Sequence, residues 1–241
     1  MEAGLAVGLS GQLALERRLS TIANNIANAG TAGFRAEGVH FSAIVSATQP
    51  FQTSFATPGA PHVDVQSGGF TKAGNPLDVA IQGESFMAIQ TPQGTAYTRD
   101  GRMQMLPGGD LVSINGHAIH DASGSPLSID PAAGPIAISR DGMIRQGPRA
   151  VGAIGLFDVD LAKGYARTEN SAFLPRSEPR PVEDFTRNGI VQGFAEESNV
   201  NPILELTRLI AVQRAFEAVS SNMEQRDTTL RDTIQALGAR S

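Results

Sequence analysis

The sequence predicts an α+β fold in which long helices at both ends accompany a central antiparallel all-β domain. Apolar residues recur at spacings of three and four near both termini, which is typical of helices that share an apolar seam. The middle of the chain instead contains short apolar runs, separated by turn residues about every 8 to 12 positions. The length of 241 residues is sufficient for one large domain or two ordinary ones.

The N-terminal helix is expected over residues 5–29. Four apolar residues at 4-3-4 spacing form its seam: Leu15, Leu19, Ile22 and Ile26. Extended backwards, the seam meets Gln12 and Gly8, so the first half of the helix has the weaker pattern. Gly30 can adopt the left-handed conformation that terminates helices, so we expect the helix to end near it.

A longer helix is expected from Ile203 to Leu237. Asn201 is a favourable N-cap, and Pro202 suits the first helical position because an N–H has no intrahelical partner there. Nine positions continue a 3-4 pattern, and seven of them are apolar: Leu209, Val212, Phe216, Val219, Met223, Arg226, Leu230, Thr233 and Leu237. A helix of about 35 residues is about 50 Å long, and a stripe of that length predicts a coiled-coil partner.

The central domain is expected to be an antiparallel sandwich or a partly open barrel. Its strand-like runs lie at residues 77–81, 86–91, 111–114, 136–138 and 154–159. Asn115-Gly116 and Asp141-Gly142 favour the positive φ angles of two-residue hairpins. The tripeptide Arg-Asp-Gly occurs at Arg99–Gly101 and at Arg140–Gly142, and both copies are interpreted as hairpin turns.

These patterns divide the chain into four segments: the N-terminal helix at 1–30, an extended linker region at 31–73, the β domain at 74–190 and the C-terminal helix at 191–241. The two helices are expected to form one coiled-coil-like domain. Within the linker region, Thr48–Pro61 contains three prolines and little periodicity, which predicts extended or mobile chain. A second proline-rich stretch, Phe173–Val182, is expected to be irregular and to lead the chain back to the C-terminal helix.

The two helices can pair only if the β domain keeps its own ends close together. Even then, burial of one apolar seam does not offset the conformational entropy lost in ordering about 35 helical residues. We therefore expect helices that are either loosely ordered in the monomer or packed into a larger bundle made by several subunits. Both alternatives indicate a protein that assembles.

Composition excludes several classes of function. The formal net charge is −5 and the isoelectric point about 5.4, so the chain lacks the basic character that recruits nucleic acid. It has no cysteine, which excludes disulfides, thiolate metal sites and cysteine catalysis. The N-terminus has no basic region followed by an apolar core, and no run of 18 apolar residues occurs, so we expect neither a cleavable signal peptide nor membrane insertion.

Candidate catalytic and metal-binding residues are few. His117 and His120 have the i, i+3 spacing of a helical metal site, but they lie in strand-like sequence, where these positions point to opposite faces. They are interpreted as surface or edge histidines. The carboxylate pairs Glu183-Asp184 and Glu196-Glu197 are interpreted as solvated turns. The sequence therefore predicts no catalytic site, no cofactor and no metal.

Three asparagines lie in the last turns of the otherwise apolar N-terminal helix: Asn24, Asn25 and Asn28. One interpretation is a fraying helix end with amide caps. The other is hydrogen bonding between neighbouring subunits, because polar residues on a seam fix its register at some cost in stability.

The chain resembles the bacterial flagellar rod and hook family. Three blocks, in the family's order, carry the resemblance: Ala23–Asn28 with Gly30–Arg35, Gly74–Gly83 with Tyr97–Gly101, and Gln192–Asn201 with Gln213–Glu217. Ile26 and Arg35 stand where the family usually has leucine and lysine. Each block alone is weak, but the combination is specific and covers most of the chain.

The resemblance implies a structural subunit of the flagellar basal-body rod, which transmits torque from the motor to the hook. Its length and single β domain are most similar to proximal-rod members, and a distal-rod paralogue is the alternative within the family. The terminal helices are then expected to polymerise in a helical array with copies of the chain and with other rod proteins. The expected assembly residues are Leu15, Leu19, Ile22, Asn24, Asn25, Ile26, Asn28, Leu209, Val212, Phe216 and Val219.

The resemblance also implies export by the flagellar type III apparatus without a cleaved signal peptide, to a rod that spans the periplasm. Phe41 and Val45 match the family's pattern for docking at the export gate, and two core residues on one helical turn are the alternative. A protein of another class stays open as well: a ligand-binding β domain carried on a helical dimerisation stalk. A stalk would give a discrete dimer, whereas a rod subunit would give a monomer with poorly ordered ends.

Overall fold

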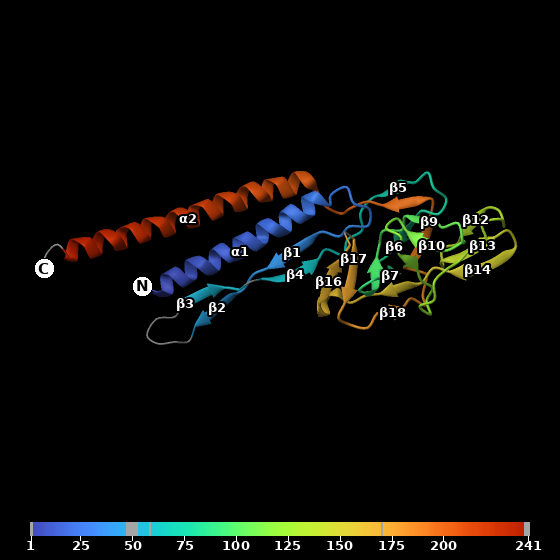
Figure 1. The fold of residues 1–241 in the computed structure, drawn as a ribbon, viewed down its shortest axis with the longest axis horizontal. Coiled ribbons are helices and arrows are strands. Elements are labelled where there is room, and N and C mark those ends of the chain that lie inside the picture. The colour runs from blue at the N-terminus through green and yellow to red at the C-terminus, as the bar shows by residue number, and fades with distance from the viewer. Residues whose placement is uncertain (1, 47–52, 58, 170, 239–241) are drawn as a thin grey trace. The chain divides into compact units, whose positions relative to one another are not determined.

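The computed structural model describes residues 2–46, 53–57, 59–169 and 171–238 (Figure 1). The chain divides into two compact units, which are described separately. The helical unit consists of residues 1–27, 37–62 and 201–241, and the β unit consists of residues 28–36 and 63–200. The predicted α+β class is confirmed, with helices towards both ends of the chain and a β-rich middle.

Two antiparallel helices dominate the helical unit: α1 (Glu2–Ala27) and α2 (Pro202–Gly238). Both agree closely with the helices expected from the apolar periodicity. Asn201 caps α2 as predicted, since its side-chain oxygen accepts a hydrogen bond of 3.2 Å from the backbone N–H of Leu204. No helix in the described part of the chain is long and apolar enough to cross a membrane.

Two strand pairs complete the helical unit. β1 (Glu37–His40) pairs with β4 (Ala60–Val63), and β2 (Ala43–Ser46) forms an antiparallel hairpin with β3 (Thr53–Ala56). The sequence predicted extended chain for this region but no pairing. In the hairpin β2–β3, the β-branched Ile44 faces the aromatic Phe55, a cross-strand pair that favours strand pairing. In the pair β1–β4, the rings of His40 and His62 are stacked with centroids 3.9 Å apart. Residues 47–52 and 58, within the proline-rich Thr48–Pro61, lie outside the described residues.

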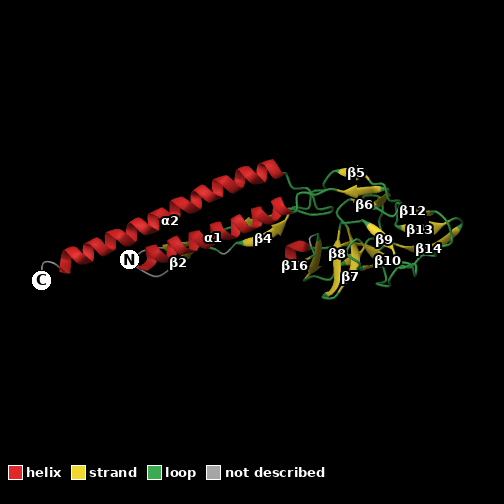
Figure 2. Ribbon diagram, turned by 45° about the horizontal axis from the view of Figure 1, so that its top comes forward, coloured by secondary structure: helices red, strands yellow, loops and turns green. Residues whose placement is uncertain are grey.

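The β unit is built around one large sheet with two smaller groups of strands (Figure 2). The large sheet has the strand order β16-β17-β8-β7-β11-β10-β9, and β15 pairs with both β7 and β18. Its strands are β7 (Phe86–Thr91), β8 (Gly94–Thr98), β9 (Met103–Met105), β10 (Leu111–Ser113), β11 (Ala118–Ile119), β15 (Leu156–Asp158), β16 (Tyr165–Thr168), β17 (Ala172–Pro175) and β18 (Arg180–Pro181).

A three-stranded sheet and two strand pairs make up the rest of the β unit. The sheet consists of β12 (Ile136–Ile138), β13 (Met143–Gln146) and β14 (Arg149–Ala153). The pairs are β6 (Val79–Gln82) with β19 (Gly189–Gln192) and β5 (Phe70–Lys72) with β20 (Phe194–Glu196). A single 3₁₀ turn spans Leu161–Lys163. These pairings are antiparallel as predicted, while the sandwich or barrel and the coiled coil stay predictions.

Two apolar clusters form the core of the β unit. The larger one is aliphatic and contains Val79, Ile81, Met87, Leu111, Ile119, Ile144 and Leu156 among its buried members. The smaller one is aromatic. Phe86 contacts Phe173 edge-to-face with ring centroids 6.0 Å apart, and Tyr97 contacts Phe157 in the same manner at 5.3 Å.

Most predicted turns connect paired strands, but two assignments were wrong. Gly116 and Gly142 have positive φ angles in the hairpins β10–β11 and β12–β13, as predicted. Arg99–Gly101 is not a hairpin turn, because β8 pairs with β7 and β17, whereas β9 pairs with β10. The stretch Phe173–Val182 is not wholly irregular, since it contains most of β17 and all of β18. Pro175 ends β17, Pro179 lies between the strands, and Pro181 ends the edge strand β18, positions at which proline is tolerated.

Candidate functional site

The apolar seams predicted on the two terminal helices are covered within one chain. Ile22 and Val212 are only 4% and 5% exposed. The other six predicted seam residues are half-buried: Leu15, Leu19, Ile26, Leu209, Phe216 and Val219. The single chain therefore uses these side chains to hold α1 and α2 together. Their role between subunits stays a prediction.

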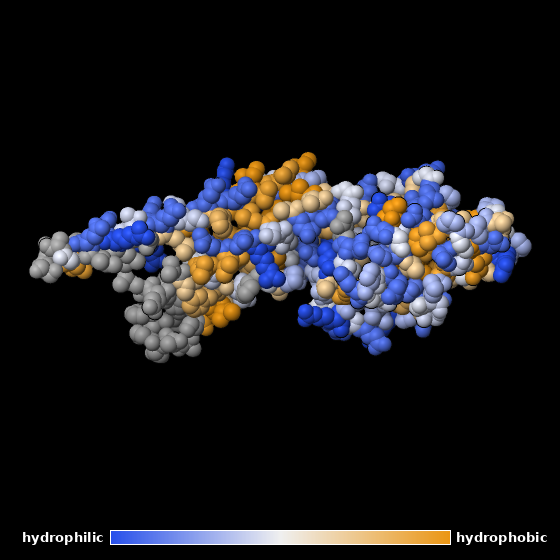
Figure 3. All heavy atoms as spheres, viewed as in Figure 1, coloured by the Kyte–Doolittle hydropathy of each residue, from blue (hydrophilic) through white to orange (hydrophobic). Residues whose placement is uncertain are grey.

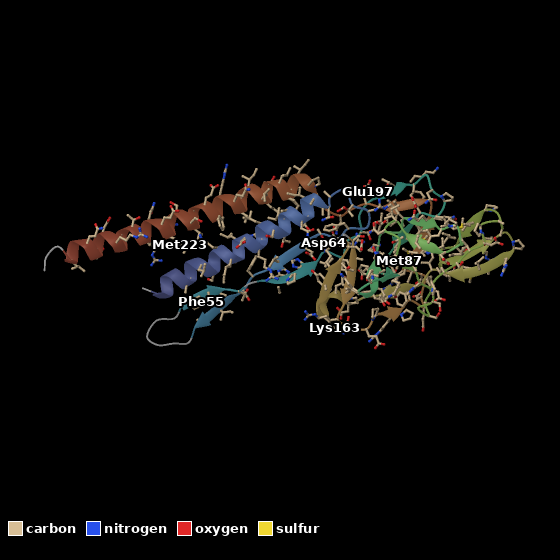
Figure 4. All side chains as sticks on the ribbon, viewed as in Figure 1. Phe55, Asp64, Met87, Lys163, Glu197 and Met223 are labelled. Carbon is tan, nitrogen blue, oxygen red and sulfur yellow. The ribbon has the colours of Figure 1, made fainter. Side chains whose placement is uncertain are left out.

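Specific contacts set the antiparallel register of the helix pair. A Cβ placed on Gly8 would lie 3.1 Å from the sulfur of Met223, a side chain labelled in Figure 4. The side-chain amide of Gln12 donates a 3.0 Å hydrogen bond to the hydroxyl of Ser220. The two positions that weakened the predicted seam therefore have defined partners on α2. Gly8 permits close approach and Gln12 supplies a polar contact.

Asn25 joins three elements of the helical unit. Its side chain is buried and forms two 2.9 Å hydrogen bonds with the backbone of Glu37, donating to the carbonyl and accepting from the N–H. Its amide nitrogen also lies 3.4 Å from the carboxylate of Glu205, in the first turn of α2. Asn25 thus fixes the first residue of β1 and the beginning of α2 against the end of α1.

The other two asparagines of the predicted cluster have different surroundings. Asn24 is exposed on α1. Asn28 lies just beyond the helix, where its side-chain oxygen accepts a 3.2 Å hydrogen bond from the hydroxyl of Thr31, and its carbonyl accepts one of 3.1 Å from the Thr31 N–H. These contacts of Asn25 and Asn28 are made within the chain, and hydrogen bonding of the asparagines between subunits stays a prediction.

Both helices also expose large apolar side chains away from their shared seam. On α1 these are Val7, Leu9 and Leu13, and on α2 they are Ile203, Leu204, Leu206, Ile210 and Leu237. Figure 3 shows hydrophobic surface over the first turns of α2. Scattered exposed apolar residues are normal, but a set concentrated on helix faces is typical of an interaction surface.

The predicted export-docking residues lie next to and within the hairpin β2–β3. Phe41 precedes β2, is half-buried, and lies close to Gly59, where an added Cβ would approach its ring to 2.8 Å. Val45 lies in β2 and is 54% exposed, beside Ile44 at 55%. The alternative of two core residues on one helical turn was wrong, because this segment is extended.

A buried ionic cluster lies in the β unit. The carboxylate of Glu196, at the end of β20, accepts a 2.6 Å hydrogen bond from Arg35 and a 2.8 Å hydrogen bond from Arg99. All three side chains are at most 1% exposed. The backbone N–H of Gly68 also donates to the Glu196 carboxylate, at 3.2 Å. One carboxylate therefore neutralises only one of the two buried guanidinium charges.

The guanidinium of Arg99 donates hydrogen bonds to three groups. Besides the bond to Glu196, it donates to the backbone carbonyls of Ser85 and Ile81. Burial lowers the pKa of Arg99 to about 10, and the Glu196 carboxylate opposes this shift. Arg99 therefore keeps its charge at neutral pH. On Arg35, Nε and Nη1 have no hydrogen-bond partner among the described residues.

Backbone hydrogen bonds surround the cluster and join residues 33–36 to residues 196–199, a region that we call the clasp. The Gly33 N–H donates to the carbonyl of Glu196 at 2.8 Å, and the Ala36 N–H donates to the side chain of Asn199 at 2.7 Å. The Asn199 N–H donates in turn to the carbonyl of Phe34, at 3.3 Å. The clasp therefore holds the segment that follows α1 beside the segment that precedes α2.

Gly33 is required by the geometry of the clasp. Its φ is +66°, and a Cβ at this position would lie only 2.3 Å from the backbone nitrogen of Asp100. Next to it, the guanidinium of Arg167 lies 4.4 Å above the ring of Phe34 and donates a 2.9 Å hydrogen bond to the carbonyl of Arg35. The three sequence blocks that carried the family resemblance meet in this one buried region.

The sequence interpretation missed this cluster. Glu196 was interpreted as part of a solvated turn, and that was wrong, because Glu196 lies in β20 and its carboxylate is buried against Arg35 and Arg99. Glu183 and Asp184 are exposed, as predicted. A weak signal was available in the sequence: the first two family blocks contain Arg35 and Arg99, and the third contains the oppositely charged Glu196.

The two histidines of the rejected metal motif have separate environments. His117 lies 2.9 Å from the carboxylate of Glu169, which also accepts a hydrogen bond from Asn115. His120 is 7% exposed, so its interpretation as a surface or edge residue was wrong: its N–H and carbonyl bond to the backbone on both sides. Among the residues that the structure describes, no group of three or more potential ligands could hold a metal ion.

Comparisons with known proteins agree with this arrangement of blocks. Residues 5–35 match the family "Flagella basal body rod protein", residues 80–146 match "Flagellar hook protein FlgE/F/G D1 domain", and residues 191–236 match "Flagellar basal body rod FlgEFG protein C-terminal". These matches define a protein of the flagellar rod and hook class.

Relatives that match the chain over nearly its full length show which family within this class it belongs to. The chain is 48% identical to the flagellar basal-body rod protein FlgF of Mesorhizobium japonicum, with all of both chains covered. It is 42% identical to FlgF of Rhizobium meliloti over 99% of each chain, and 36% identical to FlgF of Caulobacter vibrioides, also over 99% of each chain. The chain belongs to the FlgF family of flagellar basal-body rod proteins, and its family is structural rather than enzymatic.

Proposed function

We propose that the chain is a structural subunit of the proximal rod and polymerises through its terminal helices, forming part of the shaft that transmits torque. Family membership supports a place in the flagellar basal body. In this proposal, neighbouring copies and other rod proteins are the partners, and the contacts are heterologous, as a helical array requires. The periplasm-spanning location follows from the same proposal.

One observation carries the assembly mechanism: the helices retain exposed apolar faces after they have paired. Leu13 on α1 is 56% exposed and Ile210 on α2 is 51% exposed, although the seam between the helices is filled. An apolar face that remains open on a paired helix gains free energy when a neighbouring subunit covers it. The seam stabilises the subunit, and the outer faces are available for assembly.

The proposal is tested by substitutions that change either the seam between α1 and α2 or the exposed apolar side chains outside it, which we call the outer face. Ile210→Asp should leave the helix content and melting temperature of the purified protein unchanged but abolish its incorporation into rods, seen by electron microscopy of basal bodies and by swimming. Ala211→Asp, which adds the same charge at a neighbouring exposed position, is the matched control. Normal rods with Ile210→Asp would contradict the assembly role of the outer face.

A seam variant and a gene deletion complete the test. Phe216→Asp should abolish incorporation, because it disrupts the helix pair, while the β unit stays folded. Cells that lack the gene should have truncated or absent rods, and the full chain should restore swimming whereas a chain without residues 202–241 should not. Complete rods in the deletion strain would overturn the function.

We also propose that the chain is exported without a cleaved signal peptide by the flagellar type III apparatus, with Phe41 and Val45 docking at the export gate. The exposure of Val45 supports this proposal, because its side chain has no essential place in the core. Phe41→Ala and Val45→Ala should reduce the amount of exported protein measured by immunoblot. Ile44→Ala, equally exposed in the same strand but outside the pattern, is the control, and normal export of the Phe41 variant would remove the assignment.

A further inference from the structure

The buried ionic cluster carries one more positive charge than its carboxylate balances. Arg35 and Arg99 both donate to Glu196, at 2.6 and 2.8 Å, and all three side chains are at most 1% exposed. A guanidinium stays protonated at neutral pH, so one of the two positive charges has no counterpart within the cluster. Asp100, next to Arg99 in the sequence, is already paired, because its carboxylate accepts hydrogen bonds of 2.8 and 2.6 Å from Arg102.

Arg35 is the member of the cluster whose hydrogen bonds are incomplete. Its Nη2 donates to Glu196 at 2.6 Å and to the hydroxyl of Ser67 at 3.4 Å. Its Nε carries one N–H and its Nη1 carries two, and neither nitrogen has a hydrogen-bond partner among the described residues. Each nitrogen of Arg99, by contrast, donates to an acceptor. The unsatisfied donors and the excess charge therefore coincide at Arg35.

An anion satisfies these donors better than water does. Buried donors without an acceptor are costly, and the cost is larger when the donor is charged. A water molecule accepts hydrogen bonds but leaves the excess charge in place, whereas an anion also supplies negative charge, and hydrogen bonds to ions are about twice as strong as neutral ones. Arg99 responds to the same imbalance: burial is the main cause that lowers its pKa, and the charge of Arg35 acts in the same direction.

We propose that Arg35 binds a small monovalent anion of the chloride class inside the β unit, through the N–H groups that Glu196 leaves unpaired. One negative charge neutralises the cluster, so a divalent anion would exceed what the site requires. Arg35 is fully buried, and the backbone of Gly68 closes on the same carboxylate with a 3.2 Å hydrogen bond. The site therefore suits a single-atom ion and excludes bulky organic anions. The bound anion completes the hydrogen bonds of Arg35 and stabilises the clasp.

Arginine at position 35 makes this site possible. Lysine, which the family usually has at this position, would direct one ammonium nitrogen at Glu196 and would have no further nitrogen to hold an anion on another side. The planar guanidinium instead presents donors in several directions, of which Glu196 and Ser67 use only those of Nη2. We therefore expect the anion site in chains with arginine here and not in relatives with lysine.

The chloride dependence of stability tests the site. Urea unfolding of the purified full chain would be measured in sodium chloride and in sodium gluconate at the same ionic strength, which keeps electrostatic screening constant. A ligand that binds only the folded protein raises the folding equilibrium constant in proportion to its concentration once this exceeds Kd, so a tenfold increase in chloride should then raise the constant about tenfold. The wild-type urea midpoint should be higher in chloride than in gluconate.

Arg35→Lys is the test variant, and Arg145→Lys, the same substitution at an exposed arginine of β13, is the matched control. The response to chloride should vanish in Arg35→Lys and persist in Arg145→Lys. An equal response in Arg35→Lys, or none in the wild type, would mean that water alone satisfies Arg35 and would overturn the proposal.

Crystals grown in sodium bromide give a second, direct measurement, because bromide replaces chloride and is located by its anomalous scattering. A bromide peak beside the Arg35 guanidinium is the expected result. Its absence from well-ordered crystals would overturn the proposal, and neither measurement depends on the proposed rod function.

Discussion

Arg35 and Glu196 lie near opposite ends of the sequence, yet they form a buried ion pair with 2.6 Å between Nη2 and Oε1. The pair fixes the segment after α1 to the end of β20. The same carboxylate accepts a hydrogen bond from Arg99, whose block begins the family's β domain. Removal of this one carboxylate leaves two guanidinium groups buried without a counterion, which is a costly arrangement.

Glu196→Gln is therefore expected to lower the free energy of unfolding by about 3–5 kcal/mol. Urea denaturation followed by circular dichroism measures the loss. Glu197→Gln is the matched control, because the neighbouring glutamate is exposed and its change should be nearly neutral. Equal effects of the two substitutions would contradict the role of the cluster.

Arg35→Met is expected to cost less than Glu196→Gln, because the Glu196 carboxylate keeps Arg99 as its partner and the buried cluster becomes neutral. The two variants are compared by the urea concentration at the midpoint of unfolding. A larger loss from Arg35→Met than from Glu196→Gln would show that charge balance does not govern this region.

Gly33→Ala is expected to destabilise the β unit by at least about 2 kcal/mol, because an alanine at positive φ is strained and its Cβ would collide with the Asp100 backbone. Thermal unfolding measures the effect. In Gly30→Ala, by contrast, the new methyl group would meet no atom within 4 Å, and this variant should keep the melting temperature. If Gly33→Ala unfolds at the wild-type temperature, the close approach in the clasp is wrong.

Asn25→Ala is expected to cost about 2 kcal/mol, because it leaves the N–H and carbonyl of Glu37 without their partners. Hydrogen exchange at the Glu37 amide should accelerate in this variant, which identifies the loss with β1. Asn24→Ala changes an exposed neighbour of the same type and should leave that amide protected. Unchanged exchange in Asn25→Ala would contradict the assignment.

Asp121 gives a prediction for pH. Burial acts to raise the pKa of Asp121, but hydrogen bonds from the Ser123 hydroxyl and from the backbone of Ser125, Ser123 and Gly124 outweigh it and lower the pKa. A carboxyl whose pKa is lowered in the folded protein adds stability above its unfolded pKa of about 4 and loses it as the pH falls through the folded value. Asp121→Ala should therefore lower the urea midpoint at pH 7, and the difference from wild type should shrink below pH 4. A constant difference would contradict the linkage.

Much of the fold could be predicted from the sequence because its signals are local. The bounds of α1 and α2 follow from apolar periodicity, and Asn201 followed by Pro202 marks the beginning of α2. Hairpins such as β10–β11 follow from Asn115-Gly116. Each of these features depends on residues only a few positions apart, and one sequence is sufficient to show them.

The candidate site was harder to predict because its contacts are distant in sequence. Glu196 next to Glu197 has the appearance of a solvated turn until Arg35 and Arg99 are placed beside it. The pairing of β2 with β3 also depends on a hairpin that proline-rich sequence concealed. The seam residues of α1 and α2 are covered within one chain, and their predicted role between subunits stays a prediction, because the sequence alone could not distinguish a partner helix in the same chain from one in a neighbour.

The clasp has a consequence for how the family can vary. Because Ala36 is hydrogen-bonded to both Asp64 and Asn199, the longer segment of the β unit, residues 63–200, begins and ends at adjacent points. In covalent terms, the β unit consists of two segments, residues 28–36 and 63–200, inserted into the helical unit through four connections. The longer segment could be replaced by a β module of another size without a change in the register of α1 and α2. The surface of the β unit and the packing of the helices in the polymer can therefore evolve separately in such a chain.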